Sequence, residues 1–297
     1  MSTHLAAFLD AVAQPLRIGP VPTPSPAAGE ILIQNRALAI NPIDWKQQSH
    51  GVYIASYPTI LGTDSAGIIA AVGSEVTRFK VGQRVIGHGI TLATKNIANG
   101  AFQEYTICPE AAVAAIPDSM SFEDAVVLPL AISTAAAGLF EKKHLGLEYP
   151  DTPGDRSKKT ILVWGGSSSV GSLAIQMARA AGYRVLATAS ERNLEFVEGL
   201  GAMGFDYQAE GVLGRILGEV GRGEFWGAYD VFAPTVFLAE PEVGKAIWQE
   251  FLPKALADGR IKPTPKADVF GTGLEAIQGA MEKHKAGVSA SKIVVSL

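Results

Sequence analysis

The segment TILVWGGSSSVGSLAIQMARAAGYRV, residues 160–185, constrains the fold of this chain more than any other stretch. An apolar run is followed by a turn of glycine and serine, and the turn opens a long helical pattern that ends at Gly182. A second apolar run, YRVLATA at 183–189, follows this helix. Strand, helix and strand in this order indicate a βαβ unit with parallel strands.

The turn within this unit predicts an anion site. The free N–H groups and the dipole at the start of a helix favour negative charge, and small residues let the backbone approach it. Gly166 and Gly171 match the pattern G-x-G-x-x-G of dinucleotide-binding turns, whereas its middle position is Ser168. We expect a dinucleotide pyrophosphate here; the alternative is an ordinary strand–helix loop with small residues for packing. The residues expected at the pyrophosphate are Gly166, Ser167, Ser168, Ser169, Val170 and Gly171.

The end of the second strand bears on which coenzyme binds. An NAD site places Asp or Glu there to accept the ribose 2′-hydroxyl, whereas this strand is followed by Ser190, Arg192 and Asn193. A hydroxyl and a guanidinium suit the 2′-phosphate of NADP. Glu191, between Ser190 and Arg192, weighs against this choice, and Arg192 as a solvated first-turn residue is the alternative. We predict NADP.

Composition and charge exclude several classes of protein. The formal net charge is −4, without a basic block, which argues against a nucleic-acid partner. No long apolar run indicates a membrane span and the N-terminus does not resemble a signal peptide. Cys108 is the only cysteine, so disulfides within the chain and Cys-rich zinc sites are excluded. We expect a cytoplasmic protein.

Three patterns along the chain predict its domains. Residues 1–120 contain short apolar runs punctuated by Gly and Pro, which is typical of strands in a barrel or sandwich. Residues 121–240 alternate strands with helices, and residues 241–297 contain two helical stretches and a closing strand. We expect an α/β chain in which residues 1–120 and 241–297 form a β-rich domain around a parallel-sheet domain of residues 121–240.

Four segments of the β-rich part resemble the N-terminal signatures of the medium-chain dehydrogenase/reductase superfamily. They are NPIDWK (41–46), LGTDSAGIIAAVG (61–73), VGQRVIG (81–87) and GAFQEYTI (100–107). The resemblance implies a GroES-like catalytic domain and a Rossmann domain that binds NADP. It is strongest to zinc-independent, quinone oxidoreductase-like fungal reductases, including trans-acting enoyl reductases of polyketide pathways and toxin-cluster proteins of the TOXD type.

This chain departs from the zinc-dependent relatives, which use Cys in the segment matching NPIDWK and Gly-His-Glu at the position of Gly62, Thr63 and Asp64. We therefore expect no metal, because one carboxylate cannot hold tetrahedral zinc. The chemistry that remains is hydride addition to an α,β-unsaturated carbonyl, with donors that stabilise the charge on its oxygen. The resemblance assigns these catalytic roles to Lys46 and Thr134; a surface lysine and a packing threonine are the alternatives.

The resemblance implies further coenzyme contacts. Asn41 and Asp44 are expected to orient Lys46 or the coenzyme ribose. Tyr207 matches a tyrosine near the adenine or phosphate. Val288 and Ser289, just before the last strand, match a late coenzyme contact.

The Rossmann part is shorter than in the family, because the strand GAYDVF (227–232) is followed by few residues before the C-terminal helix. VFAPTVFL is the only candidate for an additional strand. Three functions stay open: an NADPH-dependent, zinc-free reductase of an enoyl or enone substrate in fungal secondary metabolite or toxin biosynthesis, a quinone reductase, and a catalytically dead NADP-binding protein. The expected partners are a small-molecule or carrier-bound acyl substrate and a polyketide or peptide synthase, without nucleic acid or membrane.

Overall fold

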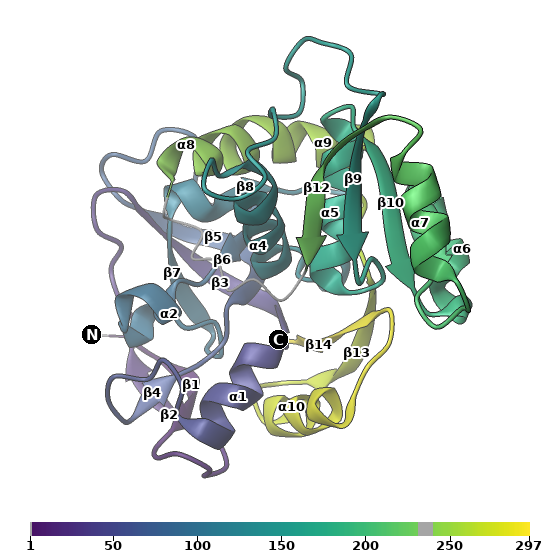
Figure 1. The fold of residues 1–297 in the computed structure, drawn as a ribbon. Coiled ribbons are helices and arrows are strands. Elements are labelled where there is room, and N and C mark those ends of the chain that lie inside the picture. The colour runs from purple at the N-terminus through teal and green to yellow at the C-terminus, as the bar shows by residue number, and fades with distance from the viewer. Residues whose placement is uncertain (1, 231–239) are drawn as a thin grey trace. The chain divides into compact units, whose positions relative to one another are not determined.

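The computed structural model describes residues 2–230 and 240–297, and they form two compact units (Figure 1). The first unit contains residues 1–130 and 266–297, and the second contains residues 131–265. The α/β fold class is confirmed: one unit is rich in antiparallel strands and the other has a parallel sheet. The predicted strand VFAPTVFL, residues 231–238, lies wholly outside the described residues.

The first unit is built on two sheets. A three-stranded sheet has the order β2-β1-β4, and a seven-stranded sheet has the order β13-β14-β3-β5-β6-β8, with β7 also paired to β3. Its strands are β1 (Thr3–Leu9), β2 (Arg17–Pro22), β3 (Glu30–Ala39), β4 (Thr59–Ile60), β5 (Asp64–Val72), β6 (Arg84–His88), β7 (Tyr105–Pro109), β8 (Val113–Ala115), β13 (Lys266–Thr272) and β14 (Ser291–Ser296). Its helices are α1 (Pro42–His50), α2 (Thr91–Thr94), η1 (Ile97–Asn99), η2 (Glu110–Ala112), α3 (Phe122–Ala125) and α10 (Ala276–Ala286).

The second unit holds a four-stranded sheet of the order β11-β10-β9-β12, in which every pair is parallel. The strands are β9 (Lys159–Trp164), β10 (Arg184–Ala189), β11 (Met203–Asp206) and β12 (Glu224–Asp230). The helices are α4 (Pro129–Phe140), which begins two residues before the unit boundary, α5 (Ser169–Ala180), η3 (Glu191–Asn193), α6 (Leu194–Gly199), α7 (Val212–Val220), α8 (Pro241–Gly244), η5 (Lys245–Phe251) and α9 (Leu252–Asp258).

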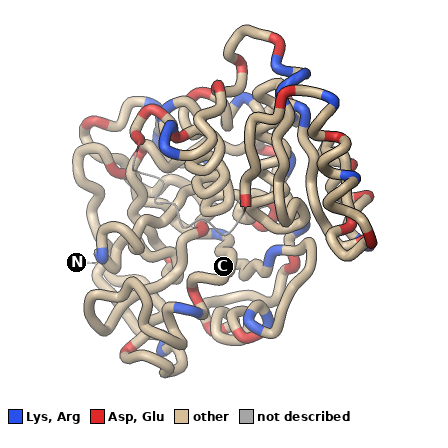
Figure 2. Tube along the Cα trace, in the orientation of Figure 1, with Lys and Arg blue, Asp and Glu red and all other residues tan. Residues whose placement is uncertain are grey.

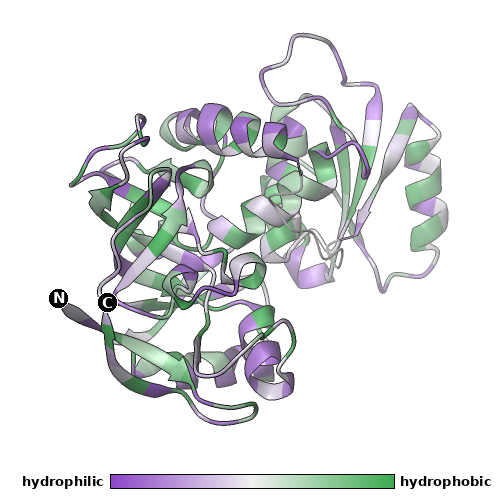
Figure 3. Cartoon of the chain, turned by 90° about the vertical axis from the view of Figure 1, so that its left-hand side faces the viewer, coloured by the Kyte–Doolittle hydropathy of each residue, from purple (hydrophilic) through white to green (hydrophobic). Residues whose placement is uncertain are grey.

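The cores follow from the apolar patterning of these elements, because hydrophobic residues run through the strands (Figure 3). In the first unit, Ile33 and Ile69 pack with Phe79 and Cys108. In the second, α7 buries Val212 and Ile216 against Leu186 and Phe205. Charges of both signs are interspersed along the chain (Figure 2).

The apolar stretch of residues 121–142 contains two helices, α3 and α4. Ser121 caps α3, since its hydroxyl accepts the N–H of Asp124 at 3.0 Å. The break falls at Pro129, which lacks an N–H and disfavours helical geometry in the residue before it. By length and composition alone, residues 122–140 could span a membrane. However, 72% of their 18-residue apolar window is buried inside the protein, as in the core helix of a folded domain.

The unit boundaries differ from the predicted domain boundaries at 120/121 and 240/241. Residues 241–265 are compact with the parallel sheet. Hydrogen bonds give the physical reason: Gln176 of α5 accepts the N–H of Lys262 at 2.7 Å and donates to the Thr264 hydroxyl at 2.8 Å. The chain therefore returns to the first unit only at β13.

Candidate functional site

The turn between β9 and α5, residues 165–171, is named the coenzyme turn below. Gly165 has a φ of +83°, a conformation that glycine adopts without strain. Its N–H donates to the Thr188 hydroxyl at 3.0 Å, and the N–H of Gly166 donates to the Thr188 carbonyl at 2.8 Å. The turn is therefore fixed to the carboxyl end of β10, the edge at which parallel α/β sheets bind ligands.

Both glycines that matched the sequence pattern are required by close packing. A Cβ on Gly171 would lie 2.3 Å from the carbonyl oxygen of Gly165. A Cβ on Gly166 would lie 2.9 Å from Cβ of Ala187 and 3.0 Å from Ile175. Neither contact is possible without movement, so these glycines let α5 approach the turn and β10 as a dinucleotide-binding unit requires.

Ser168, at the position where the pattern has glycine, caps α5. Its hydroxyl accepts the N–H of Gly171 at 3.0 Å and donates to the carbonyl of Gly165 at 2.9 Å. The N–H groups of Ser169 and Val170 begin the helix and have no acceptor within it. These amides and the helix dipole suit an anion, and residues 167–170 are at least partly exposed.

Polar side chains at the end of β10 join the coenzyme turn. The amide of Asn193 donates to the hydroxyl of Ser190 at 3.1 Å and to that of Ser167 at 3.4 Å. Arg192 is exposed, and neither it nor Glu191 has an ion-pair partner in the described part of the chain. The guanidinium is therefore not neutralised by the neighbouring carboxylate that weighed against NADP.

Tyr207 follows the neighbouring strand at the same edge. Its N–H donates to the carbonyl of Ala189 at 3.1 Å, and 47% of the residue is exposed. Thus the structure brings Ser167, Ser190, Asn193 and Tyr207 to the carboxyl ends of β9, β10 and β11. These residues fit a dinucleotide: the turn would hold the pyrophosphate, and the end of β10 would hold the ribose.

The first unit contains a second group of polar residues, named the buried polar cluster: Asn41, Asp44, Asp64 and Lys292. Each is at most 2% exposed. The ammonium of Lys292 lies 2.9 Å from Oδ2 of Asp64 and also donates to Oδ1 of Asn41. Asn41 in turn donates through Nδ2 to Oδ2 of Asp64 at 2.8 Å. Oδ1 of Asp64 accepts the N–H of Leu130 at 2.7 Å. The Asp64 carboxylate is therefore fully engaged by donors.

Asp44 is the second carboxyl group in the cluster. Its Oδ2 accepts the N–H of Asn41 at 2.7 Å at the start of α1. Burial raises the pKa of Asp44 to about 7, opposed by the hydrogen bond from Asn41 and assisted by the charge of Asp64. Burial lowers the pKa of nearby His88 to about 4. With Asp44 protonated, the ammonium and Asp64 leave the cluster without net charge.

The other predicted site residues lie as follows. Lys46 is exposed on α1, with its ammonium 5.6 Å from the ring centroid of Trp45. Thr134 lies in α4, and its carbonyl accepts the hydroxyl of Tyr229 at 3.2 Å. Val288 and Ser289 are exposed in the turn before β14. Their roles stay predictions.

Sequence reasoning did not find Lys292, or its pairing with Asp64. The available signal was a lysine within the otherwise apolar strand SKIVVSL, since a buried lysine requires a partner. Among residues 2–230 and 240–297, no group of three or more His, Cys, Asp or Glu side chains could hold a metal ion.

Comparisons with known proteins agree with this geometry. Residues 27–118 match the model of the alcohol dehydrogenase GroES-like domain. The dehydrogenase pigH of Monascus ruber is 38% identical over 369 residues, covering 100% of both chains. The trans-enoyl reductase himH of Aspergillus japonicus is 40% identical over 322 residues, covering 95% of this chain and 94% of that one. A solved alcohol dehydrogenase superfamily protein from Novosphingobium aromaticivorans has the same fold, with a TM-score of 0.76, 24% identity and coverage of 99% and 100%.

Fold and turn together define an oxidoreductase of the kind that uses a nicotinamide coenzyme. The chain belongs to the medium-chain dehydrogenase/reductase superfamily, in the group that contains fungal dehydrogenases and trans-enoyl reductases. The alignment with pigH extends over more positions than the 297 residues of this chain, so that relative contains segments without a counterpart here.

Proposed function

We propose that the chain is an NADPH-dependent, zinc-free reductase of the carbon–carbon double bond in an enoyl or enone substrate of fungal secondary metabolism. The observation that carries the proposal is the coenzyme turn: two glycines packed too closely for a side chain, a capped helix start, and Asn193 joining Ser167 to Ser190. Relatives named trans-enoyl reductases support the substrate class.

The preference for NADPH rests on the end of β10. Arg192 is exposed and has no ion pair in the described chain, so its guanidinium can form charge-assisted hydrogen bonds with a 2′-phosphate. The Ser190 hydroxyl, already oriented by Asn193, can donate to the same group. Bound NADPH supplies a hydride for the β-carbon of the substrate.

The remaining requirement is stabilisation of the negative charge that develops on the substrate carbonyl oxygen, together with a proton for the α-carbon. Lys46 and Thr134 are the proposed donors, each within its own unit. The zinc-free part of the proposal is supported by Asp64, whose carboxylate already accepts from Lys292, Asn41 and Leu130.

The test is a coenzyme-oxidation assay with the full chain. NADPH and NADH are each offered with a crotonyl thioester, a simple enone and a benzoquinone, with and without a chelator. We expect NADPH oxidation with the thioester or enone, a product that has gained two hydrogens at the double bond, and no effect of the chelator. Oxidation with the quinone alone would make the protein a quinone reductase. NADPH binding without turnover of any acceptor would make it a catalytically inactive NADP-binding protein.

A further inference from the structure

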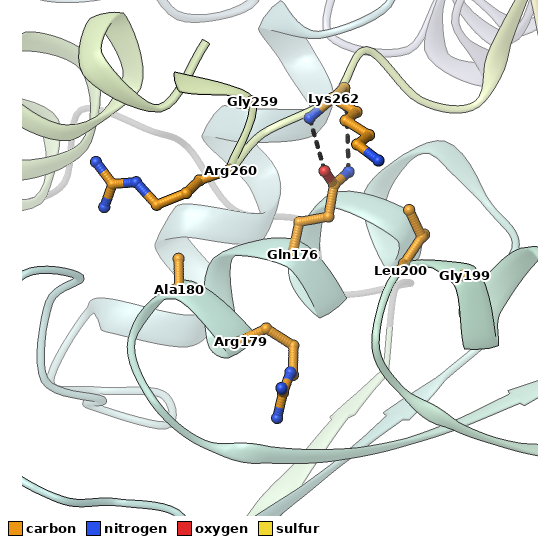
Figure 4. A pocket seen from close by; sticks show the side chains of 8 residues that line it. All are labelled: Gln176, Arg179, Ala180, Gly199, Leu200, Gly259, Arg260 and Lys262. Atoms are coloured by element: carbon orange, nitrogen blue, oxygen red, sulfur yellow. Dashed lines mark hydrogen bonds between the residues drawn. The ribbon is translucent and has the colours of Figure 1, made fainter. Parts of the chain in front are cut away.

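A pocket of about 450 Å³ lies in the second unit, between the last turns of α5, the end of α6 and the segment that follows α9 (Figure 4). Residues that line it include Gln176, Arg179, Gly199, Arg260 and Lys262. Its volume is in the range of small-molecule sites, roughly 300–1,000 Å³.

The pocket is separate from the coenzyme turn. Helix α5 starts at the carboxyl ends of the strands and returns the chain to the start of β10, so its last turns lie at the opposite edge of the sheet. At about 1.5 Å per residue, Arg179 lies roughly 16 Å along the helix axis from Ser168. Phosphates held at the coenzyme turn therefore do not reach the pocket.

The charge of the lining is positive. Arg260 is neutralised by Asp151 at 2.6 Å and Asp258 at 2.8 Å. Within the described residues, neither Arg179 nor Lys262 has a carboxylate partner, and the side chain of Arg179 makes one long hydrogen bond, 3.4 Å, to the carbonyl of Tyr183. Two cations without a carboxylate partner therefore line the pocket, and their side chains extend in different directions from it (Figure 4).

The wall that carries Lys262 is held in place by a buried side chain. Gln176 is 5% exposed; it accepts the N–H of Lys262 at 2.7 Å and donates to its carbonyl at 3.2 Å (Figure 4). Its amide also donates to the hydroxyl of Thr264 at 2.8 Å. The backbone of Lys262 is thus fixed to α5, which holds the base of its side chain at the rim of the pocket.

Two glycines keep the pocket open. Gly199 and Gly259 line it, and a Cβ on either would meet no atom within 4 Å. Gly259 has a φ of +78°, which ends α9. Gly199, in contrast, lies at the end of α6 without a positive φ, so neither packing nor backbone geometry requires glycine there.

We propose that this basic pocket binds a phosphorylated small molecule, by its phosphate group, at a site distinct from the coenzyme. Arg179 supplies a planar guanidinium and Lys262 an ammonium, the two groups that proteins use for phosphate. The pocket is larger than one phosphate ion, so the phosphate is attached to an organic group.

The experiment is calorimetric titration of the full chain, saturated with NADP, with inorganic phosphate, pyrophosphate and glycerol 2-phosphate in turn. The test variants are the double variant Arg179→Gln/Lys262→Gln and the single variant Gly199→Glu, which places a carboxylate in open space. The matched control is Arg215→Gln/Lys254→Gln, which removes two exposed charges outside the pocket.

We expect glycerol 2-phosphate to bind at least as well as inorganic phosphate, and both test variants to weaken it about tenfold or more, with the control unchanged. An equal loss of affinity in the test and control double variants would show that the compound binds to net charge alone, and it would overturn the proposal. So would the absence of binding by the wild type, or binding that both test variants retain. Thermal unfolding of each variant shows whether the fold is intact, and Gly199→Glu distinguishes pocket from fold if the double variant is unstable.

Discussion

The coenzyme turn and the buried polar cluster differ in how their polar groups meet water: the turn is partly exposed, whereas the ion pair of the cluster is buried. At the turn, N–H groups of Ser169 and Val170 begin a helix at a partly exposed edge, where an anion can reach them. In the cluster, Asp64 and Lys292 are withdrawn from water and satisfy each other. The difference is that the turn leaves backbone donors open to an anion, whereas the ion pair of the cluster is satisfied within the protein. The predictions below test this contrast from the largest expected effect to the smallest.

Removing the cation of the cluster should have the largest effect. Lys292→Met leaves Asp64 buried without its ion-pair partner, and breaking a buried pair in this way costs about 3–5 kcal/mol of the free energy of unfolding. Urea denaturation measures the change. The control is Lys266→Met, an exposed residue, which should change the free energy by less than about 0.5 kcal/mol. Similar changes in the free energy of unfolding for both variants would show that the buried ion pair does not stabilise the fold.

Adding a side chain at Gly171 of the coenzyme turn should abolish most of the affinity for the coenzyme. Gly171→Ala forces Cβ against the carbonyl of Gly165, so the turn must shift, and we expect NADPH affinity to fall about a hundredfold, or about 2.7 kcal/mol. Calorimetry measures the affinity and thermal unfolding the stability. Gly214→Ala in α7, where a Cβ meets nothing within 4 Å, is the control and should bind as the wild type does. Wild-type affinity in Gly171→Ala would exclude the turn as the binding site.

Arg192→Gln should lower the affinity for NADPH without lowering the affinity for NADH. Loss of a charge-assisted hydrogen bond, roughly 1.5–3 kcal/mol, should weaken NADPH about tenfold or more and leave NADH unchanged. Fluorescence titration with each coenzyme measures the ratio, and Arg215→Gln on α7 is the control. An equal loss for NADH and NADPH would mean that Arg192 does not read the 2′-phosphate.

The last prediction concerns Asp44, whose effect is the smallest when it is counted for a change of one pH unit. Its folded pKa of about 7 is above the unfolded value of ~3.9, so its contribution to stability is complete below pH ~4 and is lost as the pH rises toward 7. His88, with its pKa lowered to about 4, acts in the opposite sense and partly masks this trend in the wild type. The wild type should therefore lose up to about 1.4 kcal/mol per pH unit relative to Asp44→Asn across this range.

Denaturation of both proteins between pH 4 and 7 measures this difference. The Asn41 N–H keeps an acceptor in Asp44→Asn, so the variant changes titration more than packing. A difference between the two proteins that does not change with pH would show that Asp44 does not hold a proton near neutrality.

Local pattern was sufficient to predict the strand, turn and helix at residues 159–180, because they are contiguous and the glycine spacing is a short-range signal. The side-chain contacts around the turn, such as Asn193 with Ser167, depend on β10 lying beside β9, which the βαβ pattern also predicts. The family resemblance, the fold class and the fungal enoyl reductase relatives were predicted and are confirmed.

The buried polar cluster could not be predicted in the same way. Asp64 begins β5 and Lys292 lies in β14, and both strands pair with β3. Only the sheet order brings the two residues together, and no local periodicity encodes that order. The unit boundary at residue 265 was missed for a similar reason, because the bonds between Gln176 and Lys262 connect distant segments.

Ser168 has a consequence for how a ligand leaves. Its hydroxyl already closes the first turn of α5 onto Gly165 and Gly171, so under the proposed function we expect the pyrophosphate to leave without exposing backbone that must refold. We therefore expect the empty and filled forms of the turn to have nearly the same shape, which favours rapid exchange of spent for fresh coenzyme between turnovers.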